Sequence, residues 1–151
     1  MDEGTYITKR RISTEGLSKD FAKEAEENVQ NPLFGEVSLY GGALGTHAEH
    51  TSIWAFGVLF GRGGLDLKTR ALLILAGLIV LPREDLVRIW INCCLNAGWT
   101  EEEIRELIIW TSHFGGSPVA RIAGTLAVDV FDKRRANPHL KMTPSYLPWI
   151  H

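Results

Sequence analysis

The stretch of sequence that decides the fold is FGVLFGRGGLDLKTRALLILAGLIVLPREDL at residues 56–86, followed by LNAGWTEEEIRELIIWTSHFGGSPVA at residues 95–120. Apolar residues recur in both segments at the three- and four-residue spacing of amphipathic helices, and glycine and proline separate the runs. No segment alternates convincingly between polar and apolar residues with a period of two. These features predict an all-α fold of about six helices.

Capping residues mark where the predicted helices begin and end. Thr46 and Thr100 are each followed three residues later by a glutamate, which is the pattern of a capping box. Ser117-Pro118 is typical of an N-cap and a first-turn proline, and Gly98 suits the position just after a helix end. The helix interior at residues 71–81 is apolar on all sides, which predicts a helix at the centre of the core.

The chain of 151 residues is long enough to bury one core, and we expect a single domain over residues 1–151. Residues 1–16 are polar and are interpreted as an N-terminal arm, residues 17–136 as the helical core, and residues 137–151 as a C-terminal tail. The tail is rich in apolar residues and proline. It either covers a pocket mouth or a neighbouring subunit, or it is disordered.

Composition argues against several classes of partner. A net charge of −2 and the lack of a basic stripe argue against nucleic acid and anionic membranes. The longest apolar run, residues 71–81, is too short for a bilayer, which needs about 20 residues, and we expect no signal peptide. The two cysteines, Cys93 and Cys94, are adjacent, so a disulfide between them is unfavourable. We therefore expect a protein of a reduced compartment, the cytoplasm.

Three motifs occur along the chain in a fixed order. FGVLFGRGGLD at residues 56–66 precedes Thr69-Arg70, LNAGWTEEEIRE follows at residues 95–106, and GSPVA occupies residues 116–120. Over residues 53–132 this order resembles the carboxymuconolactone decarboxylase family. The resemblance implies a carboxymuconolactone-decarboxylase-like (alkyl-hydroperoxidase-like) helical bundle. It also implies a homo-oligomer, commonly a trimer or a hexamer.

The same resemblance identifies positions where this chain departs from the family. The family's acidic residue falls on Val58, and its two histidines fall on Trp90 and Trp110. Valine carries no proton, and a tryptophan side chain donates one hydrogen bond but cannot act as a base. Decarboxylation of a carboxymuconolactone is therefore not expected. The adjacent Cys93 and Cys94 do not supply the CxxC-type thiol pair that the alkyl hydroperoxidase branch needs.

The first candidate proton carrier is His113. It lies seven residues after Glu106, which places both near one helical stripe. A histidine in an apolar pocket, oriented by a carboxylate, can transfer protons near neutral pH. Alternatively, His113 is a core residue bonded to a backbone carbonyl, and Glu106 pairs with Arg70 or Arg105.

Two further histidines are candidates for the same role. His47 and His50 are three residues apart on a predicted helix, with Glu49 between them. Either can act in acid–base chemistry or contact the substrate, or both belong to a partly exposed helix start. A metal site would need two more ligands than this pair supplies. We expect neither a metal nor a cofactor.

Other residues are candidates for binding a small-molecule substrate. Arg70 stands where the family keeps an arginine, and it can hold a carboxylate or an enolate oxygen, or tie two helices together in an ion pair. Asn92 and Asn96 can each orient a carbonyl, although Asn96 suits the helix end equally well. Several aromatic side chains either form a flat apolar slot for a planar ligand or pack as core. They are Trp54, Phe56, Phe60, Trp90, Trp110 and Phe114.

Three functions remain compatible with these residues. The first is a cofactor-free lyase or isomerase of secondary metabolism, acting on a small cyclic, aromatic or polyketide-like substrate by proton transfer and enol stabilisation. Isomerisation, cyclisation and decarboxylation all fit, because an apolar cavity with one or two titratable groups is sufficient. The second is a non-catalytic small-molecule-binding or assembly protein on the same scaffold. The third is a family decarboxylase or peroxide-reducing enzyme with displaced residues.

Overall fold

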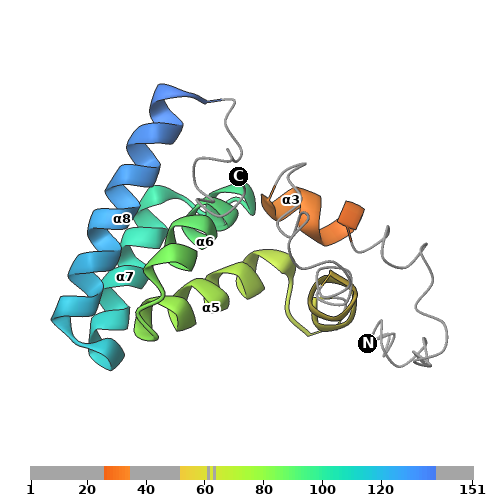
Figure 1. Cartoon of the computed structure of the whole chain (residues 1–151), viewed down its shortest axis with the longest axis horizontal. Coiled ribbons are helices and arrows are strands. Elements are labelled where there is room, and N and C mark those ends of the chain that lie inside the picture. Colours follow the sequence, from red (N-terminus) through yellow and green to blue (C-terminus); the bar gives the residue numbers. More distant parts are fainter. Residues whose placement is uncertain (1–25, 35–51, 61, 63, 139–151) are drawn as a thin grey trace. The chain divides into compact units, whose positions relative to one another are not determined.

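In the computed structural model the described residues are mostly helical (Figure 1). It describes residues 26–34, 52–60, 62 and 64–138. The chain divides into two compact units, Met1–Leu67 and Lys68–His151. The expectation of a single domain stays a prediction.

The described part of the first unit contains three short helical segments. η1 spans Glu26–Gln30, α3 spans Asn31–Phe34 and η2 spans Ser52–Leu59. Both η1 and η2 are π-helices, a rare form that often occurs at functional sites. The rings of Phe34 and Phe56 meet edge-on with centroids 5.4 Å apart, so α3 and η2 share an aromatic contact. The predicted helix start at Thr46 lies outside the described residues.

The second unit is a bundle of longer helices. They are α5 at Leu67–Val80, α6 at Glu84–Asn96, α7 at Glu101–Gly115 and α8 at Ser117–Ala136. α7 and α8 lie side by side, and α6 packs against α8 (Figure 1). The described residues contain no strand, so the predicted all-α fold is confirmed, with seven helical segments in place of about six. None of the helices in the described ranges has the length and apolar character needed to span a membrane.

The most deeply buried helix of this bundle is α6 and not α5. Every residue from Ile89 to Cys94 is buried in α6. By contrast, α5 buries one narrow stripe that consists of Ala71, Leu75 and Ile79. The prediction that residues 71–81 form the central helix is therefore wrong. The charged residues of α6 are confined to its first half, and they lower its mean hydropathy without exposing its second half.

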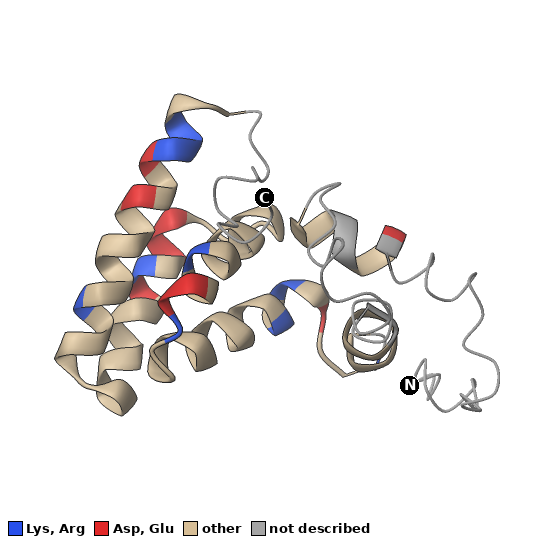
Figure 2. Cartoon of the chain, in the orientation of Figure 1, with Lys and Arg blue, Asp and Glu red and all other residues tan. Residues whose placement is uncertain are grey.

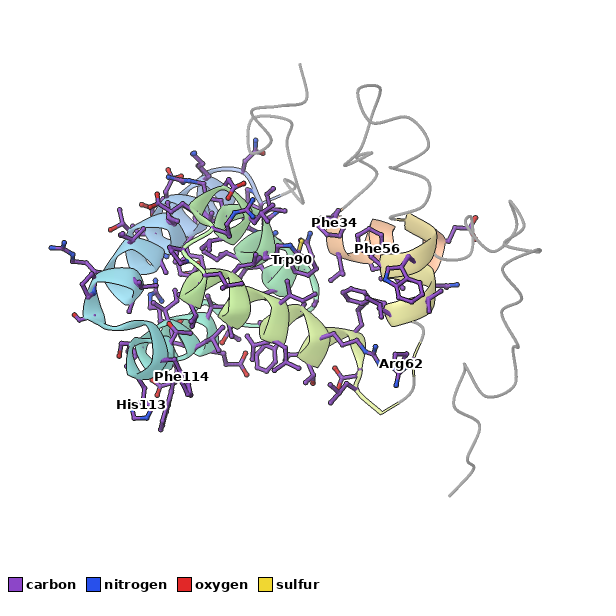
Figure 3. The ribbon with its side chains drawn as sticks, turned by 60° about the horizontal axis from the view of Figure 1, so that its bottom comes forward. Phe34, Phe56, Arg62, Trp90, His113 and Phe114 are labelled. Atoms are coloured by element: carbon purple, nitrogen blue, oxygen red, sulfur yellow. The ribbon has the colours of Figure 1, made fainter. Side chains whose placement is uncertain are left out.

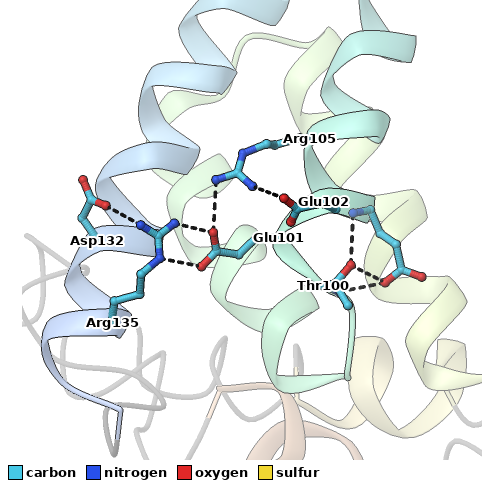
Figure 4. Close-up of polar contacts among 7 residues, drawn as sticks. Thr100, Glu101, Glu102, Arg105, Asp132 and Arg135 are labelled. Carbon is cyan, nitrogen blue, oxygen red and sulfur yellow. Dashed lines mark hydrogen bonds and ion pairs between the residues drawn. The ribbon is translucent and has the colours of Figure 1, made fainter.

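Charged side chains occur along α8 and in the first half of α7 (Figure 2). Among them, the Glu101 carboxylate accepts hydrogen bonds from Arg105 on its own helix and from Arg135 on α8 (Figure 4). The hydrogen bond from Arg135 is the main reason why the pKa of Glu101 lies below its ordinary value. The Arg105 guanidinium also lies over the ring of the buried Phe131, 4.9 Å from its centroid. These contacts tie the start of α7 to the end of α8.

Replacing Glu101 by glutamine is expected to lower the free energy of unfolding at pH 7 by about 0.5–1 kcal/mol, as for other partly exposed ion pairs. Because folding lowers the pKa of Glu101, its stabilisation is present above the ordinary value of 4.5 and is lost as the pH falls through the folded value. Urea unfolding of both proteins across this pH range measures the difference. A difference that stays constant from neutral to strongly acidic pH would contradict the assignment.

Capping residues set the ends of α6, α7 and α8. The side chain of Thr100 accepts a hydrogen bond from the backbone N–H of Glu103, whose carboxylate accepts one from the backbone N–H of Thr100. The predicted capping box is therefore confirmed. Gly98 follows α6 with a φ of +90°, a conformation that favours glycine. The N-cap of α8 is Gly116 and not the predicted Ser117, which is already the first helical residue. Gly116 has a φ of +81°, so the chain reverses there and α8 starts one residue earlier than expected.

Candidate functional site

Three predicted site residues lie on one stripe of α7. Glu106, Trp110 and His113 follow one another at steps of four and three residues, and all three are exposed. Figure 3 shows His113 and Phe114 projecting from the end of the bundle, with their rings edge-on and 5.3 Å apart. The expectation of His113 in an apolar pocket and the alternative of a core histidine are therefore both wrong for the single chain, because solvent reaches the imidazole.

Glu106 pairs neither with Arg105 nor with His113, although the sequence suggested both. Arg105 pairs with Glu101 and Glu102. His113 is two helical turns away from Glu106, about 10 Å along the helix axis, so the two side chains do not hydrogen-bond to each other. Any carboxylate that orients His113 must therefore come from elsewhere.

Asn92 and Asn96 hold an arginine of α8. The side-chain oxygens of both residues accept hydrogen bonds from the same Nη1 of Arg134, at 2.6 and 2.7 Å. Asn92 is 1% exposed, so this contact joins α6 to α8 inside the bundle. A role for either asparagine in orienting a substrate stays a proposal. Sequence reasoning missed Arg134 because it lies 42 and 38 positions away from its two partners.

The predicted aromatic residues have different environments. Trp90 on α6 is buried, whereas Trp110 on α7 faces solvent. In the first unit, Phe56 is buried and its ring lies 5.7 Å from that of Phe60, while Trp54 is exposed. Core packing therefore accounts for Trp90 and Phe56 without a ligand. Their participation in an aromatic slot stays a proposal.

The remaining candidates are one arginine and two histidines. Arg70 is half-buried in the first turn of α5, and its proposed role is binding an anionic oxygen. His47 and His50 lie outside the described residues. Within the described ranges, no cluster of three or more His, Cys, Asp or Glu side chains is placed to hold a metal ion.

A small cavity opens where the ends of α5, α6 and α8 meet. Its volume is about 10 Å³, which is close to the minimum for one water molecule. Aliphatic side chains such as Ile79, Val87 and Ile122 line it. It contains none of the predicted site residues and is too small for an organic substrate.

The two cysteines of α6 are buried free thiols. Burial raises the pKa of Cys94 to about 12 and the pKa of Cys93 well above its usual range. The thiolate is the reactive form of cysteine. Neither residue is therefore suited to reduce a peroxide at neutral pH.

Ellman's reagent provides a direct check on these thiols. With a pKa of about 12, only about 10⁻⁵ of Cys94 is thiolate at neutral pH. We expect no measurable reaction of the native protein within an hour, and reaction of both Cys93 and Cys94 after unfolding in guanidinium. Rapid reaction of either thiol in the native protein would contradict the burial described here.

Comparisons with known proteins support the family resemblance that the three sequence motifs suggested. The model of the carboxymuconolactone decarboxylase family matches residues 47–129. A 4-carboxymuconolactone decarboxylase of Acinetobacter baylyi is 39% identical over 130 residues, which cover 86% of this chain and 89% of that protein. A nitrosuccinic acid decarboxylase of Metarhizium robertsii is 39% identical over 110 residues, covering 72% and 73% of the two chains. An uncharacterized 15.0 kDa protein of Paracoccus denitrificans is 38% identical over 86 residues, covering 56% and 63%. The chain described here therefore belongs to the carboxymuconolactone decarboxylase family.

Proposed function

We propose that the protein is a decarboxylase of secondary metabolism that acts on a small carboxylic acid without a cofactor. Two relatives that align with more than two thirds of this chain are named as decarboxylases of different acids, and this observation carries the proposal. Isomerisation and cyclisation have no comparable support. Cyclic, aromatic or polyketide-like acids are the first substrate class to test.

Decarboxylation leaves the electron pair of the broken bond on the carbon that loses carbon dioxide. The substrate must therefore carry a carbonyl, nitro or similar group beside that carbon to accept the pair, and a proton must then reach the carbon. Arg70 is proposed to hold the carboxylate or the developing enolate oxygen. No base is needed to start this reaction, so Val58 and Trp90 at the family's acid–base positions are compatible with it.

The proposed proton donor is His113, with His47 and His50 as alternatives. Imidazole is the side chain best suited to deliver a proton near neutral pH. His113 is exposed in the single chain, so this role requires that another molecule of the protein cover α7. Self-association, which the family resemblance implies, is therefore part of the proposal.

The proposal is tested by measuring carbon dioxide release after dialysis of the full chain against EDTA. The panel consists of small carboxylic acids with an adjacent electron-withdrawing group, including the two acids that name the relatives. We expect saturable release from at least one acid. Arg70→Met is expected to raise KM at least about tenfold, because methionine cannot pair with an anionic oxygen. Activity that is lost with EDTA and restored by a metal ion would contradict the cofactor-free mechanism.

The second candidate function is binding without turnover. It is favoured by Val58 and Trp90, which cannot transfer a proton, and by the exposure of His113 in the single chain. Calorimetry with the same acids separates the two functions. Tight binding of an acid that is recovered unchanged after long incubation would support the binding protein and contradict the decarboxylase.

A further inference from the structure

A large apolar surface of the single chain lies on α7. Ile109, Trp110 and Phe114 are 62%, 63% and 75% exposed. Together they leave roughly 400 Å² of apolar side-chain surface in water. A patch of that size is comparable to the largest patch on a typical monomer, which is often an interaction site.

A carboxylate and an imidazole flank this apolar surface along α7. Glu106 is exposed before the apolar residues, and His113 is exposed beyond Trp110 on the same stripe. The midpoint between Glu106 and His113 falls between Ile109 and Trp110. The stripe thus has an acid toward one end, an imidazole toward the other, and apolar side chains at its centre. It is complementary to an inverted copy of itself.

We propose that this stripe, residues 106–114, is a docking surface for a second copy of the same chain. The two α7 helices pack antiparallel about a two-fold axis, which pairs one surface with itself. In this register, each Glu106 lies opposite His113 of the other copy, and Ile109 lies opposite Trp110. A parallel pair would place the two Glu106 carboxylates together, which is unfavourable.

The charged residues next to the stripe already have partners on the side of α7 that faces α8. Arg105 pairs with Glu101 and Glu102, and Arg135 reaches Glu101 from α8. The Glu106 carboxylate and the His113 imidazole lie outside these ion pairs, at the two ends of the apolar surface. Charge complementarity therefore favours a second copy over a membrane, since the stripe carries no lysine or arginine to attract anionic lipids.

The pairing also gives His113 a neighbouring carboxylate, which a single chain does not provide. Within one chain, two helical turns separate Glu106 from His113, whereas across the interface the carboxylate of the other copy lies opposite the imidazole. Trp110 and Phe114 are covered by the same contact. The pairing does not depend on the proposed reaction, because its test is the oligomeric state and not turnover.

Sedimentation velocity of the full chain tests the surface. We expect a wild-type assembly with an even number of subunits. Trp110→Glu is expected to raise the dissociation constant of the two-fold contact about 100-fold or more and to halve the mass at low micromolar concentration. Val128→Glu is the matched control, because Val128 is an apolar residue of α8 that is 51% exposed. It is expected to keep the wild-type mass.

A charge exchange tests the antiparallel register. Glu106→Lys removes the carboxylate opposite His113, and His113→Glu places two carboxylates opposite one another. Each change alone is expected to weaken association about tenfold or more. In the double variant every lysine again lies opposite a glutamate, so association should return toward the wild-type value. Both positions are exposed, and circular dichroism checks that the fold is retained.

Several results would overturn the pairing. They are a wild-type chain that stays monomeric at high concentration, a Trp110→Glu variant with unchanged mass, and a double variant no stronger than the single ones. A monomer whose tryptophan fluorescence changes when residues 139–151 are removed would assign the stripe to the chain's own C-terminal segment.

Discussion

His113→Gln is expected to lower the kcat of decarboxylation at least about 100-fold, the usual contribution of a positioned proton donor. Glutamine is close in size and keeps hydrogen bonding, but it cannot deliver a proton. At a protein concentration low enough to give the monomer, the melting temperature should change by no more than about 2 °C, because the side chain is exposed in the single chain. Stopped assays at a protein concentration where the assembly has its wild-type mass separate this effect from dissociation.

Rescue distinguishes proton transfer from a structural role of His113. His113→Ala leaves space for a free imidazole, so added imidazole should restore part of the lost rate in a concentration-dependent manner. A merely structural histidine would show no such rescue. Full activity in His113→Gln would eliminate His113 as the donor and leave His47 and His50 for the same test.

Arg134→Met is expected to lower the free energy of unfolding by about 2–4 kcal/mol, because two hydrogen bonds from a charged donor to side-chain amides are lost. The oxygens concerned belong to Asn92 and Asn96, which both accept from Arg134. Methionine retains much of the aliphatic stem, so packing changes little. Urea unfolding followed by circular dichroism measures the difference.

Arg135 provides the matched control on the same helix. Its ion pairs with Glu101 and Asp132 lie at the surface, where its side chain is 57% exposed. Arg135→Met should therefore lower the free energy of unfolding much less than Arg134→Met does. If the two variants lose equal amounts of unfolding free energy, the contact between Arg134 and the two asparagines stabilises the fold no more than a surface ion pair does.

Helix ends were predictable where a single local interaction determines them. The capping box of Thr100 and Glu103 depends on two residues three positions apart, and Gly98 depends on its own backbone conformation. The extent to which α6 is buried was not predictable, because it depends on which helices pack around α6. Hydropathy favoured residues 71–81 as the central helix, although that segment buries one stripe only.

The candidate site was predictable as a set of residue types and not as an arrangement. Histidine, glutamate and arginine can be selected from their chemistry, but the partner of Asn92 comes from another helix. The apolar side chains of Trp110 and Phe114 have the four-residue spacing of a core stripe, yet they are exposed in the single chain. One sequence does not distinguish an apolar stripe that meets its own core from one that meets a second molecule.

The most direct test of the account is turnover of a susceptible carboxylic acid in heavy water. Each event should release one carbon dioxide, and the product should carry one deuterium on the carbon that lost it. Mass spectrometry of the product and gas analysis measure the two quantities together. Equal amounts of carbon dioxide and singly deuterated product are expected. Acids that bind and are recovered with their carboxyl groups intact would contradict the assignment of a decarboxylase.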